Sequence, residues 1–335
     1  MDKTELKIYL QILKSKVKTS PYKEVEISEK QIKVRGEKNN PDTLFVLNLT
    51  EEIEANGIYT PEALDLLLLD PHADLSAYRK GDYMGWQVAG FHADDGMLLD
   101  KEKIALLTEA SGYVSKDNFR PALCRVHFKN GDIMATDGYR MGIFPTGELH
   151  RQFNLFPSTV AIVKKCAKYG TWHCVIGHTE RHESVNTVFN GCFSVTEIGV
   201  DFDTVPDMRK LIESKDTEVD TVVKVPYKQI KDILTSWKCK GESELTFDID
   251  EQYRQGESGE KALTMSLGGM LLPLRAFTDP ISAPSLKEVR VLMPRVAKGH
   301  YLSIDPSLLK AFPMGKDGSI RLAFKDELKS ILLVI

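Results

Sequence analysis

The densest group of metal-ligating side chains in the sequence lies at residues 178–183, which read HTERHE. Helical spacing would place His178 and His182 on one face, and strand spacing would do the same for Glu180 and His182. Imidazole and carboxylate groups arranged in this way could bind a zinc ion. The flanking residues, WHCVIG and VNTVFNG, favour two strands, so this segment is expected to form a hairpin turn. A metal-dependent enzyme using His178 and His182 is the less favoured alternative function.

No other motif of catalysis is present. The sequence contains no nucleophile elbow, no phosphate-binding loop and no HExxH motif, and the pair Gly268-Gly269 lacks the pattern of a dinucleotide fold. The chain is therefore not expected to be an enzyme, and no cofactor or metal is expected. Five cysteines without CxxC spacing argue against a disulfide framework or a structural zinc site and are read as buried free thiols.

Residues 118–142, NFRPALCRVHFKNGDIMATDGYRMG, have a pattern suited to binding. An alternating strand leads to Asn130 and Gly131, which form the strongest short signal for a hairpin turn. The return strand is expected to end in residues 135–141. Asp137 is expected to cap a turn, whereas Arg140, directly after this Asp-Gly turn, is an unusual residue for a core. For Leu123 and Met141, plain core packing is the alternative to a role in binding.

These segments belong to a repeated order of helices and strands. A first amphipathic helix, several strands and a second helix recur three times with a period of about a hundred residues. The pattern predicts an α+β fold of three similar domains, at residues 1–97, 98–218 and 219–335, with acidic linkers at 94–100 and 214–220. The helices are expected at residues 4–17, 60–69, 101–111, 157–168, 226–238 and 305–311. Thr60 is expected as an N-cap with Pro61 at the first helical position.

Two spaced segments resemble the bacterial sliding clamp, the beta subunit of DNA polymerase III. The run 120–141 is similar to the family's R-P-x-L…A-T-D-G-H-R-L, and 205–212, VPDMRKLI, is similar to its F-P-D-Y-R-R run. Residues 301–335 are similar to its final helix and strands. Tyr139 and Met141 replace the usual His and Leu, the first hundred residues are short, and the usual C-terminal tail is missing. A divergent clamp, for example one carried by a phage or mobile element, would account for these departures.

The resemblance implies a DNA clamp fold whose three domains form a six-domain ring as a head-to-tail homodimer. It implies a processivity factor for DNA replication that encircles duplex DNA without reading sequence and holds a DNA polymerase and a clamp loader through their short peptide motifs. Carried over residue by residue, the partner-peptide pocket comprises Leu123, Thr136, Gly138, Tyr139, Arg140, Met141, Pro206, Lys210 and Leu211. A structural or assembly module of repeated α+β domains that binds no DNA is the other alternative.

A clamp needs a positive lining that faces phosphates. Lysines recur on the polar faces of three expected helices, although lysine on an exposed helix is often only solvated. The candidate DNA-facing residues are Lys7, Lys14, Lys116, Lys164, Lys165, Lys168, Lys228, Lys231 and Lys238.

Composition agrees with this reading without deciding it. The chain has 335 residues, 42% hydrophobic and 27% charged, and a net charge of −4. That charge argues against a protein that coats DNA with its whole surface but permits a local basic strip. No apolar run is long enough to cross a membrane, and the N-terminus lacks a signal-peptide pattern, so a cytoplasmic protein is expected.

Overall fold

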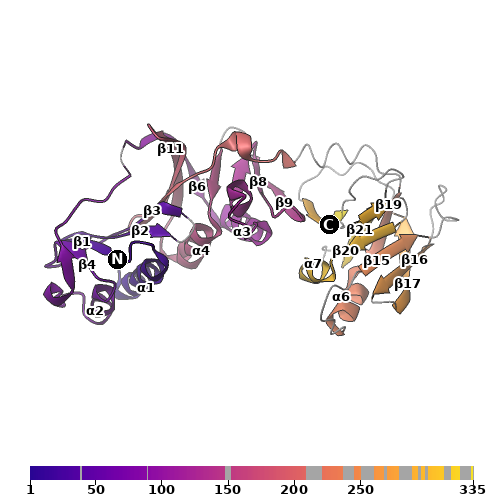
Figure 1. The fold of residues 1–335 in the computed structure, drawn as a ribbon, viewed down its shortest axis with the longest axis horizontal. Helices are drawn as coiled ribbons and strands as arrows, with labels where there is room; N and C mark the ends of the chain where they lie inside the picture. Colours follow the sequence, from indigo (N-terminus) through magenta and orange to yellow (C-terminus); the bar gives the residue numbers. More distant parts are fainter. Residues whose placement is uncertain are drawn as a thin grey trace. The chain divides into compact units, whose positions relative to one another are not determined.

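The computed structural model describes residues 1–37, 40–88, 90–147, 152–208, 221–236, 245–249, 260–267, 270–278, 289–292, 296–298, 301–312, 318–324 and 333–334. The chain forms two compact units. The first comprises Met1–Ile133 and Thr146–Val205, and the second comprises Met134–Pro145 and Pro206–Ile335. Helices and antiparallel sheets are mixed along both, as Figure 1 shows, which confirms the predicted α+β class. The division into three domains stays a prediction.

A nine-stranded antiparallel sheet runs through the first unit in the order β5-β4-β1-β2-β3-β13-β12-β11-β6. Its middle joins distant parts of the sequence, because Phe193 of β13 lies opposite Leu47 of β3. The strands are β1 (Val25–Ser28), β2 (Gln31–Glu37), β3 (Asn40–Asn48), β4 (Gly57–Tyr59), β5 (Arg79–Gly81), β6 (His92–Leu99), β11 (Trp172–Thr179), β12 (His182–Phe189) and β13 (Phe193–Ile198).

One predicted linker is wrong. Residues 94–100 were expected to form an acidic joint, but most of them lie in β6, which pairs along its length with β11. Met97 and Leu99 are buried on alternate positions, and this short apolar alternation outweighs the acidic residues before it. The other expected linker, at 214–220, lies outside the described residues.

The structure confirms all four helices predicted for the first unit. They are α1 (Lys3–Thr19), α2 (Ala63–Leu69), α3 (Lys101–Ala110) and α4 (Pro157–Cys166), and α1 packs beside α2 (Figure 1). The predicted cap at Thr60 is wrong: α2 begins at Ala63 with Glu62 as N-cap. The Thr60 and Pro61 carbonyls accept three-residue turn bonds instead, so these residues form a turn before the helix.

The predicted hairpin around Asn130 and Gly131 is confirmed. Both residues have positive φ, 56° and 83°, as a two-residue type I′ turn requires. The turn joins the neighbouring strands β7 (Val126–Lys129) and β8 (Asp132–Thr136). The return strand ends earlier than predicted, since a second turn follows β8 before β9 (Arg140–Pro145) begins. Strand β10 (Phe153–Leu155) pairs with β7 in the first unit, and β9 pairs with β18 (Val289–Leu292) in the second.

The second unit contains an eight-stranded sheet in the order β19-β20-β15-β16-β17-β14-β21-β22. Helices α6 (Tyr227–Ser236) and α7 (Pro306–Ala311) confirm the last two predicted helices. The strands are β14 (Thr221–Pro226), β15 (Leu245–Ile249), β16 (Glu260–Leu267), β17 (Met270–Thr278), β19 (Val296–Lys298), β20 (Tyr301–Ile304), β21 (Ser319–Phe324) and β22 (Leu333–Val334). The first unit also contains the short 3₁₀ helices η1 (Ser76–Tyr78), η2 (Ser111–Tyr113), η3 (Pro121–Cys124), η4 (Ala167–Tyr169) and η5 (Phe202–Thr204). Among the described residues, no helix combines the length and apolarity that crossing a bilayer requires.

Candidate functional site

Five of the nine candidate peptide-binding residues lie at or beside the turn between β8 and β9. The Asp137 carboxylate holds this turn: Oδ1 accepts hydrogen bonds from the backbone N–H groups of Tyr139 at 2.9 Å and Arg140 at 2.7 Å. Oδ2 accepts from Arg140 Nε at 3.0 Å and Nη2 at 2.8 Å. The Thr136 hydroxyl donates to the Arg140 carbonyl and accepts from the Gly138 N–H. Asp137 therefore caps the turn, as the sequence predicted.

Burial divides this turn into a structural part and an exposed part. Thr136 and Met141 are buried, and Met141 lies opposite Val291 of β18, as expected of a core residue. Gly138 is exposed and Tyr139 is 63% exposed, an unusual value for a large ring. Since Arg140 is half-buried and bidentate with Asp137, Tyr139 is the side chain of the turn most available to a partner.

The remaining candidate pocket residues lie elsewhere in the chain. Leu123 belongs to η3 in the first unit and is half-buried, and its N–H donates to the Arg120 carbonyl. Pro206 is half-buried at the start of a segment of the second unit. Lys210 and Leu211 lie outside the described residues. The structure thus assembles the turn residues 136–141 and leaves the wider pocket a prediction.

The candidate DNA-facing lysines of α1 differ in their surroundings. Lys7 is exposed, with no ion pair within the described part of the chain. Lys14 is half-buried and forms an ion pair with Asp65 of α2. A charge held by a carboxylate attracts phosphate less strongly than a free one, so Lys7 is the stronger candidate on this helix.

The lysines of α4 and the following turn form an exposed basic group. Lys164, Lys165 and Lys168 are all exposed, and Lys168 lies over the Tyr169 ring at 4.8 Å. Lysines in the last turn also interact favourably with the negative end of the helix dipole, which is a structural reason for their presence. Lys116 is exposed in a loop, and Lys228 and Lys231 are exposed on α6. Lys238 lies outside the described residues.

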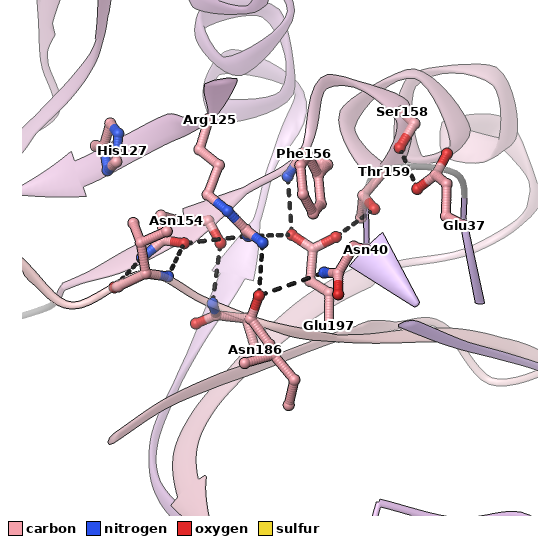
Figure 2. Close-up of polar contacts among 12 residues, drawn as sticks. Glu37, Asn40, Arg125, His127, Asn154, Phe156, Ser158, Thr159, Asn186 and Glu197 are labelled. Atoms are coloured by element: carbon pink, nitrogen blue, oxygen red, sulfur yellow. Dashed lines mark hydrogen bonds and ion pairs between the residues drawn. The ribbon is translucent and has the colours of Figure 1, made fainter. Parts of the chain in front are cut away.

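A buried carboxylate fixes the start of α4. Glu197 of β13 is fully buried and accepts hydrogen bonds from the Phe156 N–H and the Thr159 hydroxyl, both at 2.8 Å (Figure 2). Phe156 is the N-cap residue, so the carboxylate accepts from an N–H group that has no partner within the helix. Burial raises the pKa of Glu197, against the opposing effect of the Arg125 guanidinium.

Arg125 links this carboxylate to the surrounding backbone. Its Nη1 lies 3.5 Å from Glu197 Oε1 and 3.2 Å from Asn154 Oδ1, and Nη2 donates to the Ile198 carbonyl at 2.6 Å (Figure 2). The guanidinium lies 3.8 Å from the centre of the Phe156 ring. Burial lowers the pKa of Arg125. Sequence reasoning missed this network, because Arg125, which precedes β7, and Glu197 of β13 stand 72 positions apart.

A second polar contact joins α1 to the start of α4. Glu37 of β2 accepts from Lys16 of α1 and, through Oε2, from the Ser158 hydroxyl at 2.9 Å (Figure 2). The Tyr9 ring of α1 also stacks on Phe193 of β13 with centroids 4.9 Å apart. Two helices that carry candidate DNA-facing lysines are therefore held in one packed unit.

The histidine cluster takes the predicted hairpin form. Glu180 and Arg181 form the turn between β11 and β12, with Thr179 opposite His182. His178 Nδ1 lies 2.9 Å from an Asp94 carboxylate oxygen, and its ring stacks on His92 at 5.5 Å. Within the described ranges, no three His, Cys, Asp or Glu side chains are grouped as a metal site would require.

The arrangement of helices and antiparallel sheets described above is the fold of the DNA polymerase sliding clamps. A sliding clamp of Caulobacter crescentus matches with a TM-score of 0.63 at 11% identity, over 100% of this chain and 98% of that chain. The sliding clamp of Pseudomonas aeruginosa matches with a TM-score of 0.59 at 12% identity, with the same coverage. The DNA polymerase III beta subunit of Borrelia burgdorferi, solved in complex with a natural product, matches at 0.58 and 11%, over 100% and 97%.

The predicted resemblance is therefore confirmed at the level of the fold, over the whole chain. No protein-family model and no curated protein matches the chain. The low identity agrees with a clamp fold whose sequence has diverged widely.

Proposed function

We propose that this protein is a DNA polymerase processivity factor that acts as a homodimeric ring around duplex DNA and is not an enzyme. The observation that carries the proposal is the match to sliding clamps over the full length of the chain and of the matched structures. A fold shared over part of the chain would support only a common domain. The exposed lysines on α1, α4 and α6 support it independently, because a clamp must present positive charge to phosphates of any sequence.

The ring follows from symmetry. Three similar domains per chain cannot close around a duplex, whereas two chains joined head to tail supply six and close with two-fold symmetry. Such a ring holds its partner near the primer end by topology, which raises the partner's effective concentration without tight contact to DNA. An acidic protein with local lysine groups suits this role, since weak contacts permit sliding.

The partner surface is proposed at the turn 137–141. Tyr139 offers an exposed aromatic face, and the Asp137–Arg140 pair keeps the turn in one conformation before a partner arrives. A prearranged surface loses less entropy on binding an extended peptide. The motif resemblance extends this proposal to Leu123, Pro206, Lys210 and Leu211.

Imaging of the purified protein tests the ring directly. Particles classed from negative-stain images should be two-fold rings with a hole wide enough for duplex DNA, at a mass of two chains. Compact particles without a hole, at concentrations where a dimer persists, would contradict the proposal and favour a module that does not encircle DNA.

Salt dependence tests the DNA-facing surface. Replacing Lys164, Lys165 and Lys168 with Gln should weaken DNA binding uniformly across sequences and lower the salt slope by about one per lost phosphate contact. A matched triple variant with the same charge change uses the exposed lysines Lys30, Lys80 and Lys101. Equal loss in both triple variants would show that net charge, and not α4, determines binding.

A further inference from the structure

The first unit contains a cavity that the proposed function does not use. Its volume is about 550 Å³, within the range of small-molecule sites. The floor includes Leu44, Trp86 and Ile198, and the rim includes the turn of the β11–β12 hairpin. All lining residues belong to the first unit, so the cavity lies within one compact body.

One of the side chains that line the cavity, Arg35, is a cation without a counter-ion among the described residues. The Arg35 guanidinium lies 4.0 Å from the centre of the Tyr22 ring and 5.1 Å from that of Trp86, and these cation–π contacts fix its position. In the part of the chain that the structure describes, no carboxylate or carbonyl pairs with this guanidinium. Its Nε and the Trp86 Nε1 are both buried without a hydrogen-bond partner.

Arg35 is half-buried, but its Nε and the indole N–H call for an explanation, because buried polar atoms normally have a hydrogen-bond partner. Arg35 sits between aromatic rings, as arginine does where it is kept ready for a planar anion. A second cation, the exposed Arg181, lies on the rim. The apolar floor supplies contacts for a hydrocarbon group beside the anion.

The rim also limits the ligand's charge. Asp42 and Glu180 are exposed lining residues and would repel a polyanion such as a nucleoside triphosphate or a DNA strand. A single carboxylate on an apolar or aromatic group matches both the cation and the floor. We propose that this cavity binds such a carboxylate, from a free acid or from the C-terminal residue of a peptide, with Arg35 as its ion partner.

Phenylacetate is a suitable first probe, with phenylacetamide as its neutral match. The chain has three tryptophans, so ¹⁵N-indole labelling gives three resonances, and Trp86→Phe assigns the one in the cavity. We expect saturable shifts of the Trp86 resonance with phenylacetate and at least about tenfold weaker binding of the amide, the loss expected for a charge-assisted bond. Acetyl-Ala-Phe and its C-terminal amide distinguish a peptide source from a free acid.

Arg35→Gln should abolish the phenylacetate response while the Trp172 resonance stays unchanged. Because Arg35 packs between rings, a second pair of variants uses the exposed rim residue Gln87. Gln87→Glu should weaken and Gln87→Arg strengthen phenylacetate binding, each about two- to threefold, as expected for one added charge near the ligand in a solvated rim. Equal affinity for phenylacetate and phenylacetamide, or no opposite effect of the two Gln87 variants, would overturn the proposal.

Discussion

Acid should destabilise the first unit through a single buried histidine. His127 of β7 is 1% exposed, and its Nε2 lies 2.5 Å from the Ala122 carbonyl, so the neutral ring carries its proton there. Nδ1 is buried without a partner. Burial lowers the pKa of His127 from 6.5 to about 4, and the nearby Arg125 charge adds to this effect.

The sign follows from proton binding. In the unfolded chain the ring titrates near its ordinary pKa, so between pH 6.5 and 4 the unfolded state binds more protons than the folded state. The contribution to stability is complete above pH 6.5 and is lost as the pH falls toward 4. A difference of this size corresponds to about 3 kcal/mol, a large fraction of the stability of a typical domain.

His127→Gln is the control variant. The glutamine amide N–H can donate to the Ala122 carbonyl as Nε2 does, but the glutamine side chain does not titrate. Urea unfolding at several pH values, in a Trp237→Phe background, follows the tryptophans Trp86 and Trp172 of the first unit. The wild type should lose about 3 kcal/mol more than His127→Gln between pH 7 and pH 4. The two proteins contain the same carboxylates, so the contribution of these groups to the pH dependence of stability cancels in the difference. Parallel losses in the two proteins would refute the reasoning.

Three further results are expected. Arg125→Met should cost about 3–5 kcal/mol of unfolding free energy at neutral pH, because it leaves the Glu197 carboxylate buried without its cation. Adding Glu197→Gln should recover part of this loss, as measured by urea unfolding. Tyr139→Ala should weaken the binding of a clamp-partner peptide at least tenfold in a titration, whereas Leu69→Ala, at a side chain that is 84% exposed, should not. Equal effects of the two changes would remove Tyr139 from the proposed pocket. Glu26→Gln should cost about 1–3 kcal/mol and speed amide exchange at Met84, Gly85 and Trp86, whose N–H groups bond to the Glu26 carboxylate.

The helices could be predicted because their signals are local. Asp2 accepts from the Glu5 N–H at the start of α1, and Asp305 accepts from the Ser307 N–H at the start of α7. The hairpin at Asn130 and Gly131 is equally local, since only residues that tolerate positive φ form that turn. Each of these elements depends on a few neighbouring residues.

The candidate site was less predictable because it depends on contacts distant in sequence. Spacing places Arg140 after an Asp-Gly pair but cannot show that its guanidinium turns back onto Asp137, which makes Arg140 a structural residue of the turn. Likewise, the lysine stripe of α1 gives no sign that Lys14 pairs with Asp65. Residues of like pattern thus differ in their availability to a partner.

The largest departure from the sequence pattern concerns residues 82–88, an irregular segment that we call the strap. In β1, Val25 and Ile27 are buried on one face and the intervening Glu26 is also fully buried, although strand geometry directs it to the opposite face. The strap covers that face: Glu26 accepts its three N–H groups, and Lys33 donates to the Trp86 carbonyl at 3.0 Å. A carboxylate and an amine in a strand normally indicate a solvent-facing side of the sheet. Here they satisfy the backbone of an irregular segment, which places Trp86 against Arg35 and thereby forms one wall of the proposed carboxylate cavity.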